Sequence, residues 1–254
     1  METNNYFDLK RLYLLTRRQI LSERTGWLIA LTAVAGIMLV ISLLVAYFNP
    51  VLMPALTPSY LSIMFLGGYI FTSSIFNELH YPQKAVHFLT LPVSTTERLL
   101  AAWIITGILF PIFSLILIAL IVFIANLIMN LTLDLTPFNH VFSNGGSGVF
   151  RSYLITQSVF LLGAAYFRKY NFLKTLLAIF IFIVVITAIT ATAGWMIFSP
   201  FSGQEFADDS ENLTVNLNSL FAERIPDLAR FIYFYAGVPF FLVVTWFTLK
   251  ERQV

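Results

Sequence analysis

Long uncharged apolar segments constrain the fold of this chain more than any other feature. Trp27–Phe48 contains no charged residue, and about 20 apolar residues in a helix are enough to cross the hydrocarbon core of a bilayer. Charged residues make up 11% of the 254 residues, whereas soluble domains carry about 25%. We therefore expect an all-α, polytopic membrane protein, with residues 1–254 forming a single transmembrane domain.

Six segments are long and apolar enough to be transmembrane helices, namely residues 27–48, 60–76, 99–129, 149–167, 176–198 and 231–249. The third is longer than a bilayer requires, so its start should lie outside the membrane, and Pro111 should kink it. The interiors of these segments carry no Asp, Glu, Lys, Arg or His, and Arg151 lies at the end of the fourth. This absence argues against a proton- or ion-coupled carrier and against an intramembrane aspartyl or metalloprotease.

The positions of Lys and Arg predict the orientation. With six spans, both termini lie on one side, and that side holds 12 of the 15 basic residues: Lys10, Arg11, Arg17, Arg18, Arg24, Lys84, Arg98, Arg168, Lys169, Lys174, Lys250 and Arg252. Arg151, Arg224 and Arg230 fall on the other side. By the positive-inside rule, we expect a multi-pass protein of the plasma (inner) membrane with both termini cytoplasmic.

The first 25 residues are expected to form an amphipathic helix on the membrane surface. Its basic face consists of Lys10, Arg17 and Arg24, which repeat every seven residues, with Arg11 and Arg18 beside them. Its other side is apolar, with Leu9, Leu12, Tyr13 and Ile20. Such a pattern is typical of an interfacial helix attracted to anionic lipid. A solvated charged leader is the alternative.

Residues 77–98 form a polar loop between the second and third spans. Pro82 suits the first turn of a short helix, in which Ala85, Phe88 and Leu89 would form one apolar stripe. Pro92 ends that helix, because the residue before a proline disfavours the α conformation. Ser94 and Glu97 then have the spacing of a capping box, which predicts a new helix start.

This loop resembles the first cytoplasmic loop of ABC-2 type transporter permeases. The resemblance rests on Glu78, on a helix ending in FLTLPVS, and on the Glu97-Arg98 pair that opens a long membrane helix. It implies that the loop forms a coupling helix that docks on a separate ATPase subunit. The implied docking residues are Glu78, Pro82, Ala85, Phe88, Leu89, Pro92, Glu97 and Arg98. The alternative is an ordinary cytoplasmic loop that packs against its own bundle.

Residues 200–230 should form the only sizeable outer loop. Its first part is acidic, and residues 218–230 contain enough apolar side chains for a short helix on the outer surface. ABC-2 permeases commonly place short outer helices there, so the layout is similar. A solvated loop is an equal alternative.

Polar groups inside the spans are few. Gln157 and Asn126 could line a path or satisfy a neighbouring backbone carbonyl, and the small residues of 187–194 could form a dimer seam or pack within one subunit.

The sequence predicts no catalytic site. It has no cysteine, no histidine pair with zinc-ligand spacing and no GxxxxGK[ST] phosphate loop, so we expect neither an enzyme nor a resident cofactor. A net charge of +2 is too small to indicate nucleic-acid binding. The resemblance implies a permease subunit, working as a homodimer or permease heterodimer, whose partner ATPase binds the ATP. It would export an amphipathic or lipid-like substrate. The alternative is a non-transporting membrane scaffold that holds a soluble cytoplasmic partner.

Overall fold

The computed structural model describes residues 7–49, 52–80, 93–133, 146–198 and 225–251, and every regular element among them is helical. This confirms the all-α prediction for the described part of the chain. The helices are α1 (Leu9–Phe48), α2 (Met53–Ser74), α3 (Asn77–His80), α5 (Thr95–Trp103), the π-helix η2 (Ile104–Leu109), α6 (Phe110–Leu133), α7 (Gly146–Tyr166), α8 (Asn171–Phe198) and α10 (Ile225–Glu251).

Three stretches of helix are long and apolar enough to cross a membrane, and they support a membrane location for the protein. They are Ile29–Phe48 in α1, Thr95–Ile128 across α5, η2 and α6, and Asn171–Met196 in α8. They correspond to the first, third and fifth predicted spans. The second, fourth and sixth predicted spans are also helical, as α2, α7 and α10, but as membrane crossings they stay predictions.

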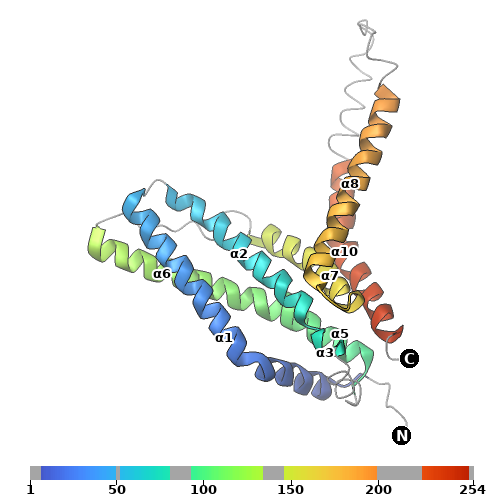
Figure 1. Cartoon of the computed structure of the whole chain (residues 1–254), viewed down its shortest axis with the longest axis horizontal. Helices are drawn as coiled ribbons and strands as arrows, with labels where there is room; N and C mark the ends of the chain where they lie inside the picture. The colour runs from blue at the N-terminus through green and yellow to red at the C-terminus, as the bar shows by residue number, and fades with distance from the viewer. Residues whose placement is uncertain (1–6, 50–51, 81–92, 134–145, 199–224, 252–254) are drawn as a thin grey trace, which may run out of the picture.

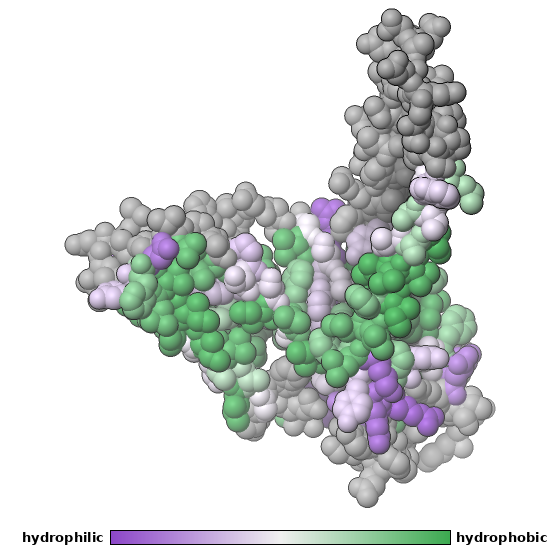
Figure 2. All heavy atoms as spheres, turned by 45° about the horizontal axis from the view of Figure 1, so that its top comes forward, coloured by the Kyte–Doolittle hydropathy of each residue, from purple (hydrophilic) through white to green (hydrophobic). Residues whose placement is uncertain are grey.

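The long helices form two groups that diverge (Figure 1). In one group α1, α2 and α6 pack side by side, and in the other α7 packs against α10 and the start of α8. The helix α7 also packs against α2, so it joins the two groups. The start of α1 and the end of α10 lie at the end of the molecule where α3 and α5 are found. Hydrophobic side chains dominate the middle of the described surface in Figure 2, and hydrophilic ones gather mainly towards one end.

The expected interfacial helix and the first expected span are one continuous helix. α1 runs from Leu9 to Phe48 and is bent part-way along (Figure 1), so the two segments are its two arms. Asp8 starts the helix, because its side chain accepts a hydrogen bond of 2.8 Å from the backbone N–H of Lys10. This is ordinary N-capping by an aspartate.

Among the described residues, the buried apolar side chains form three clusters. One lies among α1, α2 and α6 and includes Met38, Tyr60 and Ile121. A second joins the end of α2 to α5, α7 and α10 through residues such as Phe76 and Leu161. The third, at the start of α1, is treated below. By contrast, almost all of residues 176–196 of α8 are exposed, so this helix presents apolar side chains on all sides.

The predicted kink at Pro111 takes the form of a π-helix. The backbone N–H of Phe110 donates to Ile105 O, five residues back, instead of to Thr106 O as an α-helix requires. Continuing that register would pair Thr106 O with Pro111, which has no N–H. The hydroxyl of Tyr153 in α7 donates to Thr106 O instead, at 2.8 Å. The side chain of Tyr153 is fully buried, and it supplies the donor that the proline lacks.

Gly68 in α2 makes room for this tyrosine. A methyl group at Gly68 would lie 2.7 Å from Cε2 of Tyr153 and 2.9 Å from Cε1 of Phe110. Both distances are too short for real contacts, and Tyr153 is held by its hydrogen bond to Thr106. The glycine therefore sets how closely α2 approaches α7.

We expect Gly68→Ala to destabilise the fold by about 1–3 kcal/mol, the usual cost of overpacking a core. Gly36→Ala is the matched control, because nothing lies within 4 Å of a methyl group at that position of α1. Thermal unfolding in detergent should give a lower midpoint for the first variant and an unchanged or slightly higher one for the second. Equal midpoints would mean that α2 and α7 do not pack as described.

Candidate functional site

The candidate site is the start of α5, at the end of the predicted docking loop of residues 77–98. The capping box predicted there is confirmed: Ser94 Oγ accepts the backbone N–H of Glu97 at 3.3 Å, and Glu97 Oε2 accepts that of Ser94 at 2.8 Å. Two backbone donors that a helix start leaves unpaired are thereby satisfied. The residues that follow the loop therefore have one defined conformation.

The carboxylate of Glu97 also binds the start of α1, 89 residues earlier in the sequence. Its second oxygen, Oε1, accepts the backbone N–H of Asp8 at 2.8 Å and lies 3.5 Å from Nη2 of Arg11. Arg11 in turn has its Nε 3.8 Å from the Asp8 carboxylate. The side chain of Glu97 is 0% exposed, so this buried carboxylate is surrounded by two backbone N–H donors, those of Ser94 and Asp8, and by the guanidinium of Arg11.

Apolar packing reinforces this contact. Leu12 and Leu15 of α1 form a buried cluster with Ala101 of α5, and Val93, Leu100 and Ile104 pack against it. Sequence reasoning placed Leu12 on the membrane-facing side of the leader helix, but its burial against α5 means that protein contacts fix this edge of the helix. Leu9, Tyr13 and Ile20 remain exposed.

The predicted docking residues fall into two sets. Pro82, Ala85, Phe88, Leu89 and Pro92 lie outside the described residues, as does the expected short helix that contains them. Glu78 lies in α3. Glu97 and Arg98 are described and are buried at 0% and 5% exposure, so both side chains pack within the chain. Whether this loop docks on a partner stays a prediction.

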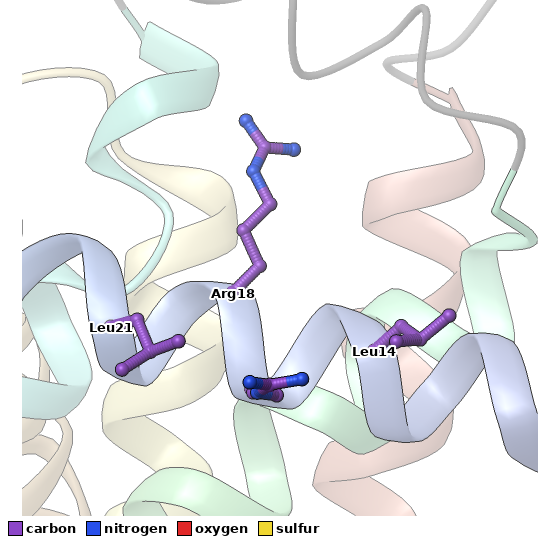
Figure 3. A pocket seen from close by; sticks show the side chains of 4 residues that line it. Leu14, Arg18 and Leu21 are labelled. Carbon is purple, nitrogen blue, oxygen red and sulfur yellow. The ribbon is translucent and has the colours of Figure 1, made fainter.

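The basic residues of the leader helix have different surroundings. Lys10, Arg17 and Arg18 are exposed, whereas Arg11 faces Glu97 and is half-buried; Arg24 belongs to α1. Within the described residues, Arg17 and Arg18 take part in no ion pair. Together with Leu14 and Leu21 they line a shallow surface pocket on α1, shown in Figure 3. Cationic and apolar groups side by side suit the headgroup region of a membrane.

Asp8 is a site residue that sequence reasoning missed. An aspartate just before an apolar-periodic segment is a helix-start signal, and it could have marked the beginning of α1. No sequence pattern indicates that its backbone N–H would meet Glu97. Among the described residues, no three His, Cys, Asp or Glu side chains lie together as metal ligands would.

Comparison of the chain with protein-family models, with curated proteins and with solved structures gives no match.

We expect Glu97→Ala to cost more than about 2 kcal/mol of stability. Loss of a cap alone costs about 0.5–2 kcal/mol, and hydrogen bonds to a charged group contribute about 1.5–3 kcal/mol more. Lys10→Ala is the control, because this side chain at the start of α1 is exposed, and it should stay within about 0.5 kcal/mol of wild type. Thermal unfolding in detergent measures both. If Glu97→Ala lowers the stability by no more than the loss of an ordinary helix cap does, the stabilising contacts of Glu97 with Asp8 and Arg11 are refuted.

A second prediction separates the arginines of α1. Replacing Arg17 and Arg18 by Gln should weaken the attraction of this helix to anionic lipid, since each basic residue near the surface contributes about 1 kcal/mol. Arg11→Gln should leave that attraction nearly unchanged and lower the thermal stability instead. The measurement is the depth of a spin label at Leu14 in anionic and in neutral vesicles. The difference in depth should shrink only in the Arg17/Arg18 variant; an equal effect in both variants would refute the separation.

Proposed function

We propose that this chain is the membrane-spanning permease subunit of an ATP-binding cassette transporter. It works as a homodimer or with a second permease chain, and a separate ATPase subunit powers it. The substrate is amphipathic or lipid-like and is exported. The proposal rests on the resemblance of the 77–98 loop to that of ABC-2 permeases. It is compatible with the described part of the chain, whose regular elements are helical and include three apolar stretches of membrane-spanning length.

One structural observation carries the proposal, namely the buried attachment of Glu97 to the start of α1. Glu97 lies at the end of the proposed docking loop, after the expected coupling helix at residues 82–90, and in the first turn of α5. α5, η2 and α6 then continue as one helical segment from Thr95 to Leu133. If a partner displaced the loop, both α1 and the α5–η2–α6 segment would therefore move with it. A coupling element needs such a connection to pass on movement.

The mechanism that we propose is mechanical. ATP binding closes the partner ATPase dimer, and the coupling helix at residues 82–90 moves with it. The capped start of α5 transmits the movement to the helices, and the π-helix before Pro111 gives the α5–α6 segment a place to bend. The helices then rearrange and pass the substrate. This chain supplies no ATP-binding residues in that scheme.

The proposal includes six spans in the plasma (inner) membrane, with both termini and residues 77–98 and 168–175 cytoplasmic. It is supported by the positive-inside pattern and by the position of the start of α1 and the end of α10 at one end of the molecule (Figure 1). In this arrangement residues 49–59, 130–148 and 200–230 are outside.

Labelling of introduced cysteines tests this topology, because the chain has no cysteine of its own. Asn49→Cys and Thr96→Cys place a thiol at exposed positions near opposite ends of the helices. In intact cells, an impermeant reagent should label Asn49→Cys and spare Thr96→Cys until the cells are opened. The reverse pattern would show that the orientation is inverted.

The docking prediction concerns Phe88 and Leu89, the proposed apolar anchors of the coupling helix. Changing both to Asp should release the ATPase and abolish transport, since burial of each large apolar side chain contributes about 1.5–3 kcal/mol. The matched control is Gln83→Asp with Thr90→Asp, which adds the same charge on the opposite face of the expected helix. Retention of the ATPase during purification in detergent is measured, together with thermal stability.

Each result has a distinct meaning. A stable Phe88/Leu89 variant that loses the ATPase, with a control that keeps it, supports docking through the apolar stripe. An unstable variant means that these side chains pack on their own bundle, and a stable one that still retains the ATPase overturns the coupling helix. Binding of the ATPase without any change in its hydrolysis rate would instead favour a scaffold that transports nothing.

A further inference from the structure

The short connection between α7 and α8 carries three exposed basic side chains, which we call the basic turn. They belong to Arg168, Lys169 and Lys174, and within the described residues none of them takes part in an ion pair. Lys174 lies in the first turn of α8, but its Nζ is 5.9 Å from the centre of the Phe167 ring, so its charge lies back over the connection. Three positive charges therefore gather in one place, and no described carboxylate neutralises them.

The backbone of this connection is unusual at Tyr170. Its φ of 54° lies in the left-handed region, which is unfavourable for a bulky side chain. The tyrosine side chain is 76% exposed, so packing in the core of the chain does not compensate for this conformation. Tyrosine is favoured at membrane surfaces, where its ring lies among lipid and its hydroxyl reaches water. Tyr166, one helical turn earlier, is exposed as well.

An apolar stripe leads away from the basic turn along α8. Leu173, Leu177 and Phe180 have the spacing of one helical face, and each is more than half exposed. They belong to Asn171–Met196, a stretch long and apolar enough to cross a membrane. Because the basic turn lies just before this stretch and in its first turn, its charges are placed where lipid headgroups meet the acyl chains.

This order of groups matches an anionic phospholipid. The cations complement a negatively charged headgroup, the tyrosines suit the depth of the headgroups, and the apolar stripe suits an acyl chain. A zwitterionic lipid fits less well, because its own ammonium group cancels the charge of its phosphate. An acidic segment of a protein would satisfy the cations, but it would not use the apolar stripe below them.

We propose that the α7–α8 connection is a binding site for an anionic phospholipid. The basic turn surrounds the phosphate of the headgroup, and one acyl chain lies along the apolar stripe of α8. The site requires only that α8 is in a membrane, and it does not depend on the proposed transport function.

The experiment measures which lipid lies against α8 beside the basic turn. The chain has no cysteine, so Leu177→Cys allows a single bimane fluorophore to be attached to the apolar stripe. The full chain is placed in nanodiscs of phosphatidylcholine with a minor share of phosphatidylglycerol. In one preparation the phosphatidylglycerol carries bromine on its acyl chains, and in the other an equal amount of phosphatidylcholine carries it. Bromine quenches a fluorophore that it contacts, so the ratio of the two quenching strengths gives the local enrichment of the anionic lipid.

We expect an enrichment of about fivefold or more, since that is the factor that one basic residue near a membrane surface contributes. Changing all three residues of the basic turn to Gln should abolish the enrichment and leave the thermal stability unchanged, because these side chains are exposed. The matched control changes Lys10, Arg17 and Arg18 of α1 to Gln. It removes the same net charge and should leave the enrichment beside α8 intact. A fluorophore at Leu120→Cys, an exposed position of α6, should show no enrichment.

Three results would overturn the proposal. The first is equal quenching by the two brominated lipids at Leu177→Cys. The second is an enrichment that persists when the basic turn is replaced. The third is an equal loss in both triple variants, because the net charge of the chain, and not the basic turn, would then attract the lipid.

Discussion

The hydrogen bond from the Tyr153 hydroxyl to the Thr106 carbonyl joins the two halves of this structure. An apolar surrounding leaves no backbone group free to find water, so the carbonyl that Pro111 leaves unpaired has to be satisfied from a neighbouring helix. Only α7 supplies that donor here, and α7 is also the helix that contacts α2, α8 and α10. The contact between α7 and η2 therefore determines where the group of α1, α2 and α6 meets the group of α7, α8 and α10. Gly68 permits the approach because it has no side chain to occupy the place of the tyrosine ring.

A second connection between distant segments lies at the end of the molecule where α1 starts and α10 ends. There a single buried carboxylate, that of Glu97, closes the first turn of its own helix and also holds the start of α1. The two functions are coupled, because the oxygen that caps α5 and the oxygen that receives Asp8 belong to one rigid group. Movement of the helix start would thus shift the leader helix as well. The proposed coupling scheme uses this property, since the preceding loop and the leader helix would respond together.

Local features of this chain could be predicted from sequence, and contacts between distant segments could not. The Ser94–Glu97 spacing predicted a capping box, which the structure confirms, because the bonds involved lie within four residues. The heptad spacing of the basic residues predicted a shared face, and Arg17 with Lys10 is indeed exposed. By contrast, the sequence predicted that Arg11 lies beside the basic surface face, whereas in the structure it pairs with Glu97, which is far away in the sequence. Pro111 predicted a kink, but its π-helical form depends on a tyrosine 42 positions later in the sequence. For the same reason Gln157 could be recognised as an embedded amide, but its partner Thr106 could not be identified.

The exposure of α8 has a consequence for how this helix recognises other molecules. Its threonines at 190 and 192 donate their hydroxyl hydrogens to carbonyls of their own helix, at 2.9 Å from Ile186 O and Ala188 O. With those donors used internally, this part of α8 offers methyl groups, aromatic rings and small gaps. The shape and size of the neighbouring acyl chain or protein surface, and not hydrogen bonds, therefore decide how well it packs against this part of α8. Such a surface prefers the neighbours that fill it best, but the preference between two similar neighbours is small. Many different acyl chains or protein surfaces can therefore pack against α8.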